Sequence, residues 1–250
     1  MNGVHTLNMI QNEVVTSRRD RRHDARRSQF LAAARAVAEQ DGLDALTIKG
    51  LARRLDCAVG TMYTYFPSKG ALLAALQADA IERLAEVYDG AADRLEALVG
   101  DLHDDGCALA RLVAFGRFII VAERAMPEEF HLQQQLLVAS GLADSDHVDE
   151  VVPVAFALLA RPEGLLEDGV ARGVLAPGEP FDRTVSWVAA VNGVLSLAGI
   201  QHPGAGLFDT GLLADRLTRD LLVGWGADPV ALEAAAAAVP LDRLEELFVP

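Results

Sequence analysis

The chain has 250 residues, 51% of them apolar, which is enough for a small domain joined to a larger one with a substantial core. Two cysteines and scattered histidines exclude a disulfide framework and give no metal-ligand spacing, and no apolar run reaches the ~18–20 residues of a membrane-spanning helix. The start of the chain lacks the basic-then-apolar pattern of a signal peptide. We therefore expect a cytoplasmic protein with reduced thiols, no cofactor and no bound metal.

The net charge of −14 argues at first against a nucleic-acid partner, but the charge is unevenly distributed. Residues 1–69 carry 11 Lys and Arg against 7 Asp and Glu, a net +4, whereas residues 70–250 carry 11 against 29, a net −18. Phosphate contacts depend on the local potential at the docked surface. Because the acidic remainder would repel DNA, the distribution favours DNA binding through the N-terminal end alone.

Residues 1–22 are expected to form a flexible basic arm, because positions 1–17 lack a clear pattern and Arg18–Arg22 contain four arginines. The arm is either a solvated tail or a segment that lies along the DNA backbone or in the minor groove, and the sequence leaves both open. A domain over 23–68 then begins with a helix that Gly42 is placed to end. Its inward residues recur at helical spacing and are Phe30, Ala33, Ala34 and Val37.

Two short helices joined by a tight turn are predicted between Thr47 and Tyr65. The first has one apolar stripe, and the Thr47 hydroxyl is placed to cap its first turn. That stripe consists of Ile48, Leu51, Ala52 and Leu55. The second helix, about Val59 to Tyr65, is too short to be stable alone and must be held by neighbours, as a recognition helix is. An ordinary helical hairpin is the alternative interpretation.

The outward residues of the second helix carry hydroxyl groups, which suit phosphate oxygens and base edges better than burial. They are Thr61, Tyr63, Thr64 and Tyr65. The whole segment resembles the DNA-binding domain of the TetR family of transcriptional regulators, whose signature runs T-x-x-x-[LI]-A-x-x-x-G-V-S-x-G-T-[LM]-Y-x-[HY]-F-x-[SN]-K. The matching residues are Thr47, Leu51, Ala52, Gly60, Thr61, Met62, Tyr63, Tyr65, Phe66, Ser68 and Lys69.

The resemblance implies a set of DNA contacts. Thr47, Tyr63 and Lys69 would contact phosphates and so set the register on the duplex. The residues that would approach base edges are Lys49, Ala58, Val59, Gly60, Thr61, Thr64 and Tyr65. The chain departs from the family pattern at the turn, where Asp56-Cys57-Ala58 replaces the usual Gly-Val-Ser. Asp56 must then adopt the turn conformation, and Ala58 cannot cap the recognition helix.

Residues 69–227 are predicted to form a larger helical domain for effector binding and dimerisation, and 228–250 a helical extension without an assigned role. A helix is expected from Ser68, and a further segment follows it. The helix has Leu73, Leu76, Ala80, Leu84 and Val87 in register, and the next segment carries Leu95, Leu98, Val99 and Leu102. We expect an acidic loop at His103–Gly106 and regard a metal site there as the weaker alternative. Pro153 is expected to delay or kink one helix, and Pro162 to begin the next.

The last two predicted helices of this domain, Asp182–Ile200 and Thr210–Trp225, resemble those that pair two subunits of the family as a four-helix bundle. An intramolecular core is the alternative, and Asp215 is expected to face outward. The interface residues would be Trp187, Val191, Val194, Leu213, Leu217, Leu221 and Trp225.

The sequence as a whole predicts an all-α, ligand-responsive DNA-binding regulator, most simply a repressor that binds a palindromic operator as a homodimer and is released by a small apolar effector. An activator of the same fold and a sequence-indifferent architectural protein are the alternatives. The histidines form no catalytic motif, so an enzyme is not expected. Candidate effector-pocket residues, each of which would otherwise be core, are Phe115, Phe118, Met126, Phe156, Trp187 and Asn192.

Overall fold

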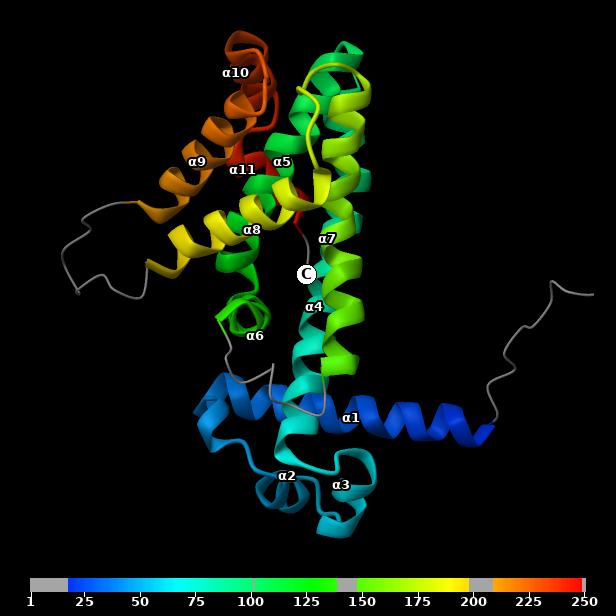
Figure 1. The fold of residues 1–250 in the computed structure, drawn as a ribbon. Coiled ribbons are helices and arrows are strands. Elements are labelled where there is room, and N and C mark those ends of the chain that lie inside the picture. Colours follow the sequence, from blue (N-terminus) through cyan, green and yellow to red (C-terminus); the bar gives the residue numbers. More distant parts are fainter. Residues whose placement is uncertain (1–17, 101, 139–147, 198–208, 249–250) are drawn as a thin grey trace, which may run out of the picture. The chain divides into compact units, whose positions relative to one another are not determined.

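The computed structural model describes residues 18–100, 102–138, 148–197 and 209–248, and every regular element within these ranges is helical (Figure 1). The all-α prediction is therefore confirmed. The chain divides into an N-terminal unit, residues 1–69, and a C-terminal unit, residues 70–250. No helix in the described part of the chain is long and apolar enough to cross a membrane.

The N-terminal unit contains α1 (Arg18–Asp41), the short 3-10 helix η1 (Leu43–Ala45), α2 (Ile48–Arg54) and α3 (Val59–Tyr65). Gly42 follows α1 with a positive φ of 81°, a conformation open to glycine at little cost. The prediction of a flexible arm was wrong for Arg18–Arg22, because these residues form the first turns of α1. Arginine is a good helix former, and nothing between Arg18 and Phe30 interrupts the helix. Positions 1–17 of the expected arm lie outside the described residues.

Helix α4 runs without a break from Lys69 to Val99, where a helix and a further segment were expected. One side of α4 remains apolar beyond Leu84, as far as the buried Leu95. Packing against that side therefore continues the helix where the sequence pattern was weak. The expected acidic loop at His103–Gly106 is also corrected: α5 (Asp104–Ala125) begins there, and Asp104 and Asp105 lie in its first turn, where carboxylates complement the helix dipole. Among the described residues no His, Cys, Asp and Glu cluster is placed to hold a metal ion.

Two prolines lie inside a single helix, α7 (Val148–Ala171), where the sequence predicted a break. Pro153 is the sixth residue of the helix, beyond the first turn, so it also removes an i→i−4 hydrogen bond. Pro162 is interior and costs about 3 kcal/mol of helix stability. Because α7 packs against both α5 and α8, tertiary contacts offset that loss and keep the helix continuous.

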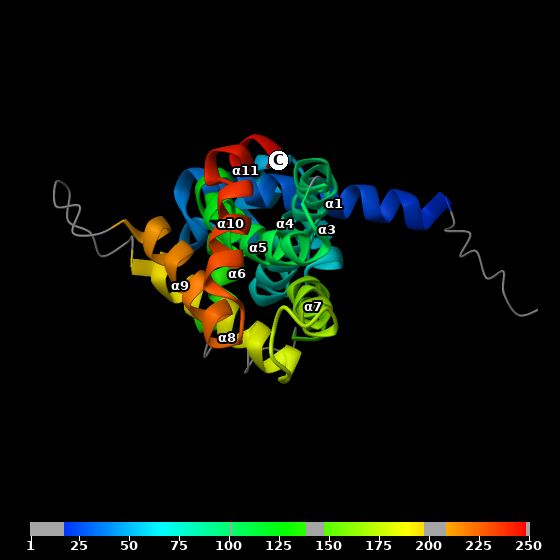
Figure 2. The same ribbon diagram turned by 90° about the horizontal axis from the view of Figure 1, so that it is seen from above.

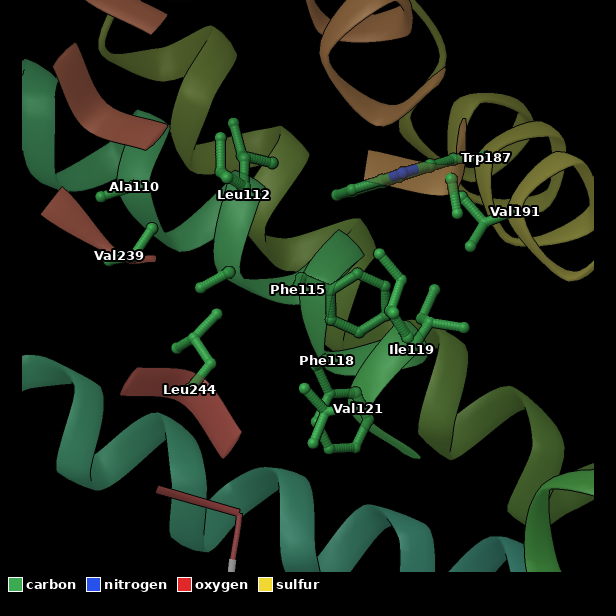
Figure 3. Close-up of a cluster of buried hydrophobic side chains, with 14 of the residues drawn as sticks. Ala110, Leu112, Phe115, Phe118, Ile119, Val121, Trp187, Val191, Val239 and Leu244 are labelled. Carbon is green, nitrogen blue, oxygen red and sulfur yellow. The ribbon is translucent and has the colours of Figure 1, made fainter. Parts of the chain in front are cut away.

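Helix α5 is the centre of the C-terminal unit (Figure 2). It contacts α6 (Pro127–Val138), α7, α8 (Pro180–Ser196), α9 (Thr210–Gly224), α10 (Pro229–Ala238) and α11 (Leu241–Leu247). Nearly every residue from Ala108 to Ala122 is buried, which explains its almost uninterrupted apolar sequence. Figure 3 shows its Phe115 and Phe118 rings between Trp187 on one side and Leu244 on the other.

One charged side chain of α5 joins the C-terminal extension to this core. Arg117 is 9% exposed; its Nε donates to Asp215 Oδ1 at 2.6 Å, and its Nη1 donates to the carbonyl oxygens of Ala236 and Val239 at 2.7 and 2.5 Å. These carbonyls lie at the end of α10, where backbone acceptors lack helical partners. Asp215 was expected to face outward, and the ion pair with Arg117 explains why it does not.

Candidate functional site: a helix-turn-helix and an apolar cavity

The turn between α2 and α3 is built by local hydrogen bonds. Thr47 caps α2, its hydroxyl accepting from the Gly50 N–H at 3.0 Å, as predicted. At the other end of α2, the Cys57 N–H donates to the Ala52 carbonyl and the Asp56 N–H to the Arg53 carbonyl, which is the Schellman pattern. Asp56 has φ 47° at the position where glycine is usual, and Ala58 makes no side-chain cap to α3.

Most of the predicted DNA-contacting residues are exposed on the N-terminal unit. Tyr63 is 47% exposed, and Thr64 is exposed with its hydroxyl donating to the Gly60 carbonyl at 3.1 Å. A Cβ added at Gly60 would meet no atom within 4 Å, so the backbone there is open to approach. The other exposed members of the set are Thr47, Lys49, Ala58 and Lys69, and Val59 and Thr61 are half-buried.

Tyr65 differs from this set, because its ring packs within the N-terminal unit. It stacks on His23 with ring centroids 4.5 Å apart and meets Phe30 edge-on at 5.0 Å. The side chain therefore holds α3 against α1, which corrects the expectation that it points outward to base edges. Sequence reasoning missed this contact because His23 lies in the segment that precedes the predicted helix core.

The C-terminal unit contains an apolar cavity of about 90 Å³, measured as space for the centre of a water molecule. It lies between α4, α5, α7 and α8 and reaches α6. Its lining residues are Ile81, Leu84, Phe115, Phe118, Ile119, Ala122, Phe130, Gln133, Ala155, Leu158, Leu159, Val188 and Asn192. The aliphatic members escaped prediction, since nothing in a sequence distinguishes a leucine beside a cavity from one in solid core.

Of the six predicted pocket residues, Phe115, Phe118 and Asn192 line this cavity. Trp187 is instead fully buried, where its Nε1 donates to the Thr218 hydroxyl at 3.0 Å. Met126 is also buried but away from the lining. Phe156 is 54% exposed on α7 and stacks on Phe181, so its assignment to the pocket was wrong.

Asn192 brings a polar atom to the apolar cavity. The residue is 4% exposed, and its Nδ2 donates to the Val188 carbonyl at 2.8 Å. Its Oδ1 is buried without a hydrogen-bond partner. Since a buried acceptor left unpaired costs about 1–3 kcal/mol, a bound molecule with an O–H or N–H group would gain affinity at this point.

Two predicted interface residues on α8 are unavailable to a partner, because Trp187 and Val191 are fully buried in the chain's own core. Val194, Leu217, Leu221 and Trp225 are half-buried, and Leu213 is 40% exposed. The face of α8 that remains open is rotated from the predicted one. It carries Val185, Ala189 and Gly193, spaced four residues apart.

Comparison with known proteins places this geometry among bacterial regulators. Residues 30–76 match the family model described as "Bacterial regulatory proteins, tetR family". The chain is 33% identical over 139 residues to the HTH-type transcriptional repressor KstR of Mycolicibacterium smegmatis and 30% identical over 160 residues to KstR of Mycobacterium tuberculosis. These alignments cover 53% and 63% of this chain, and in both cases 61% of the relative's length.

Solved structures share the fold over most of the chain. A protein of unknown function from Rhodococcus sp. RHA1 matches with a TM-score of 0.59 and 23% identity, covering 80% of this chain and 94% of its own. RolR in complex with resorcinol matches with a TM-score of 0.58 and 19% identity, and the match covers 86% of this chain and 95% of RolR. Residues 30–76, which contain the capped helix-turn-helix, therefore match the TetR family of bacterial regulatory proteins, and the solved structures share the fold of the larger part of the chain.

Proposed function

We propose that the chain is a ligand-responsive transcriptional repressor that binds a palindromic operator as a homodimer and leaves it when a small, largely apolar effector binds. The observation that carries the proposal is the exposed, hydroxyl-bearing surface of α3, held by a capped α2 and a Schellman turn. The repressor role follows the names of the two KstR relatives. One recognition helix reads only a few base pairs, so specificity requires two of them about one helical turn of DNA apart.

The two tyrosines of α3 provide a matched test of the DNA-binding surface. Tyr63→Ala should weaken operator binding about tenfold or more while the melting temperature stays nearly unchanged, because Tyr63 is exposed. Tyr65→Ala should lower the melting temperature, because its ring packs on His23 and Phe30. Operators selected from genomic fragments and measured by gel shift against random duplex provide the readout. If Tyr63→Ala binds as the unaltered chain does, α3 is not the reading element.

Dimerisation is proposed through the open faces of α8 and α9. Val185 on α8 is 41% exposed, and Leu212 and Leu213 on α9 are 63% and 40% exposed. The small residues Ala189 and Gly193 permit close helix approach. Replacing Val185 and Leu213 with Glu should give monomers by light scattering, whereas Val230→Glu, at an exposed position of α10, should leave the dimer mass unchanged. A dimer that persists in the double variant would exclude this interface.

Effector binding is proposed at the apolar cavity, with Asn192 Oδ1 accepting a hydrogen bond from the ligand. RolR, which shares the fold, has been solved with resorcinol, an aromatic compound with two hydroxyl groups. The effector would cause the protein to release DNA only to the extent that it binds the DNA-incompetent conformation more tightly than the DNA-binding conformation. Asn192→Leu should therefore reduce binding of small hydroxyl-bearing ligands, such as short alcohols, more than binding of ligands of similar size without a donor, by calorimetry.

A further inference from the structure

A second cavity of about 100 Å³ lies beside the first in the C-terminal unit. Phe115 and Phe118 line both cavities. The second is otherwise lined by α4 (Tyr88, Ala91, Ala92, Leu95, Glu96), α5 (Arg111, Ala114, Val121), Leu165 of α7, and Leu244 and Phe248 at the C-terminal end. Its walls thus include the extension to which the sequence assigned no role.

The two cavities follow one another along the same three helices. On α4 the lining moves from Ile81 and Leu84 in the first cavity to Tyr88–Glu96 in the second, and on α7 from Leu159 to Leu165. On α5 the two linings overlap at Phe115 and Phe118, and the second extends further toward the start of the helix, to Arg111. At 1.5 Å per residue, the eight residues from Leu84 to Ala92 correspond to about 12 Å along the helix axis.

Aromatic side chains lie where the two cavities adjoin, since Phe115 and Phe118 line both. The Tyr88 ring meets Phe115 at 5.3 Å and Phe118 at 4.7 Å, both edge-on. Figure 3 shows the Phe115 and Phe118 rings on α5, with Trp187 of α8 on one side and Leu244 of α11 on the other. On the far side, Phe118 also contacts Phe248, with ring centroids 5.1 Å apart. A change of the Phe118 side-chain rotamer is the movement that would open space between the two cavities.

The sizes of the cavities indicate why joining matters. An apolar cavity of ~150 Å³ is known to admit benzene. Each of these cavities alone is smaller than that, whereas the two together are larger. A ligand confined to the first cavity would have to be very small.

We propose that the two cavities are compartments of one elongated effector site, with a hydrogen-bonding head group at Asn192 and an apolar tail that passes Phe118 into the compartment closed by α11. The ligand class is an elongated amphipathic molecule, such as an alkyl chain with a terminal hydroxyl. The inference rests on the proposed effector function of the first cavity. It assigns the C-terminal extension a role as one wall of that site.

Primary alcohols from 1-butanol to 1-dodecanol, titrated by calorimetry, test the proposal on the full chain. Affinity should rise about fourfold per added methylene through the long members of the series, because each buried methylene contributes equally. Ala155 lines only the first cavity and Ala92 lines only the second. Both residues are half-buried, so they give a matched pair of variants. Ala92→Phe should leave short alcohols unaffected and abolish the gain from the longer chains. Ala155→Phe should weaken all members.

Three results would overturn the proposal: an affinity plateau at short chains in the unaltered protein, an Ala92→Phe variant that binds long alcohols normally, and no alcohol binding at any length. Circular dichroism checks that each variant folds, and Ala91→Phe, on the same wall, replaces Ala92→Phe if that variant does not. Failure of the proposed regulatory function would appear separately, as a lack of operator preference in gel shifts without any alcohol.

Discussion

Arg117 is expected to be the most sensitive charged position in the C-terminal unit. Replacing it with Met keeps much of the side chain's apolar stem but removes three hydrogen bonds, to Asp215 and to the carbonyls of Ala236 and Val239. Each carbonyl left unpaired in the interior costs about 1–3 kcal/mol. Asp215 keeps one partner, Arg219 at 3.0 Å, so its charge is only partly uncompensated. Breaking a buried ion pair from one side typically costs about 3–5 kcal/mol, and we expect a loss in that range.

Urea unfolding followed by circular dichroism measures the loss, and amide hydrogen exchange shows where it acts. Exchange should accelerate first in α10 and α11, which Arg117 connects to α5. Arg124→Met is the matched control, because Arg124 also lies on α5 and pairs with Glu245 of α11, but both side chains are about half exposed. That surface pair should contribute about 0–1 kcal/mol. Equal losses in the two variants would refute the reasoning that burial, and not the charge pair itself, sets the magnitude.

Three further outcomes are expected. Asp56→Gly should stabilise the N-terminal unit by about 1 kcal/mol in thermal unfolding, because glycine accepts φ 47° without the steric penalty of a side chain, whereas Asp56→Ala should not stabilise it. Ala58→Ser should add about 0.5–2 kcal/mol by capping α3, and an unchanged melting temperature would mean that the serine hydroxyl makes no cap. The Arg161 guanidinium, hydrogen-bonded to Asp89, holds the pKa of that carboxyl below its usual value. This pair therefore stabilises the fold above about pH 4, by up to ~1 kcal/mol, and the contribution is lost as the pH falls. Arg161→Met should flatten the acid side of a plot of melting temperature against pH, and an unchanged slope would contradict the assignment.

The helix-turn-helix could be derived from the sequence because its determinants are local. The cap at Thr47, the apolar stripe of α2 and the turn at Asp56 all lie within about ten residues, and each predicts its own hydrogen bonds. The start and end of α3 were predicted correctly for the same reason. The likeness of this segment to a known family supplied the set of expected DNA contacts, and those contacts remain predictions.

The interior of the C-terminal unit could be predicted only in part. Phe115, Phe118 and Asn192 lie at the cavity, but Phe156 is exposed and Trp187 fills the core. Helices such as α5 and α8 are apolar on several sides, so their sequences do not show which side meets a neighbour and which meets a void.

The sequence by itself determined that the chain is helical, that its positive charge gathers at one end, and where the recognition helix begins and ends, because propensity, charge and capping act over short distances. Only the tertiary structure decided that Pro153 and Pro162 share one helix, that Asp215 turns inward to pair with Arg117, and that two cavities share Phe118 in their lining. These features depend on residues far apart in the chain, such as Arg117 and Asp215, which are 98 residues apart. The free energy of such contacts arises from burial by other helices, which no local pattern records.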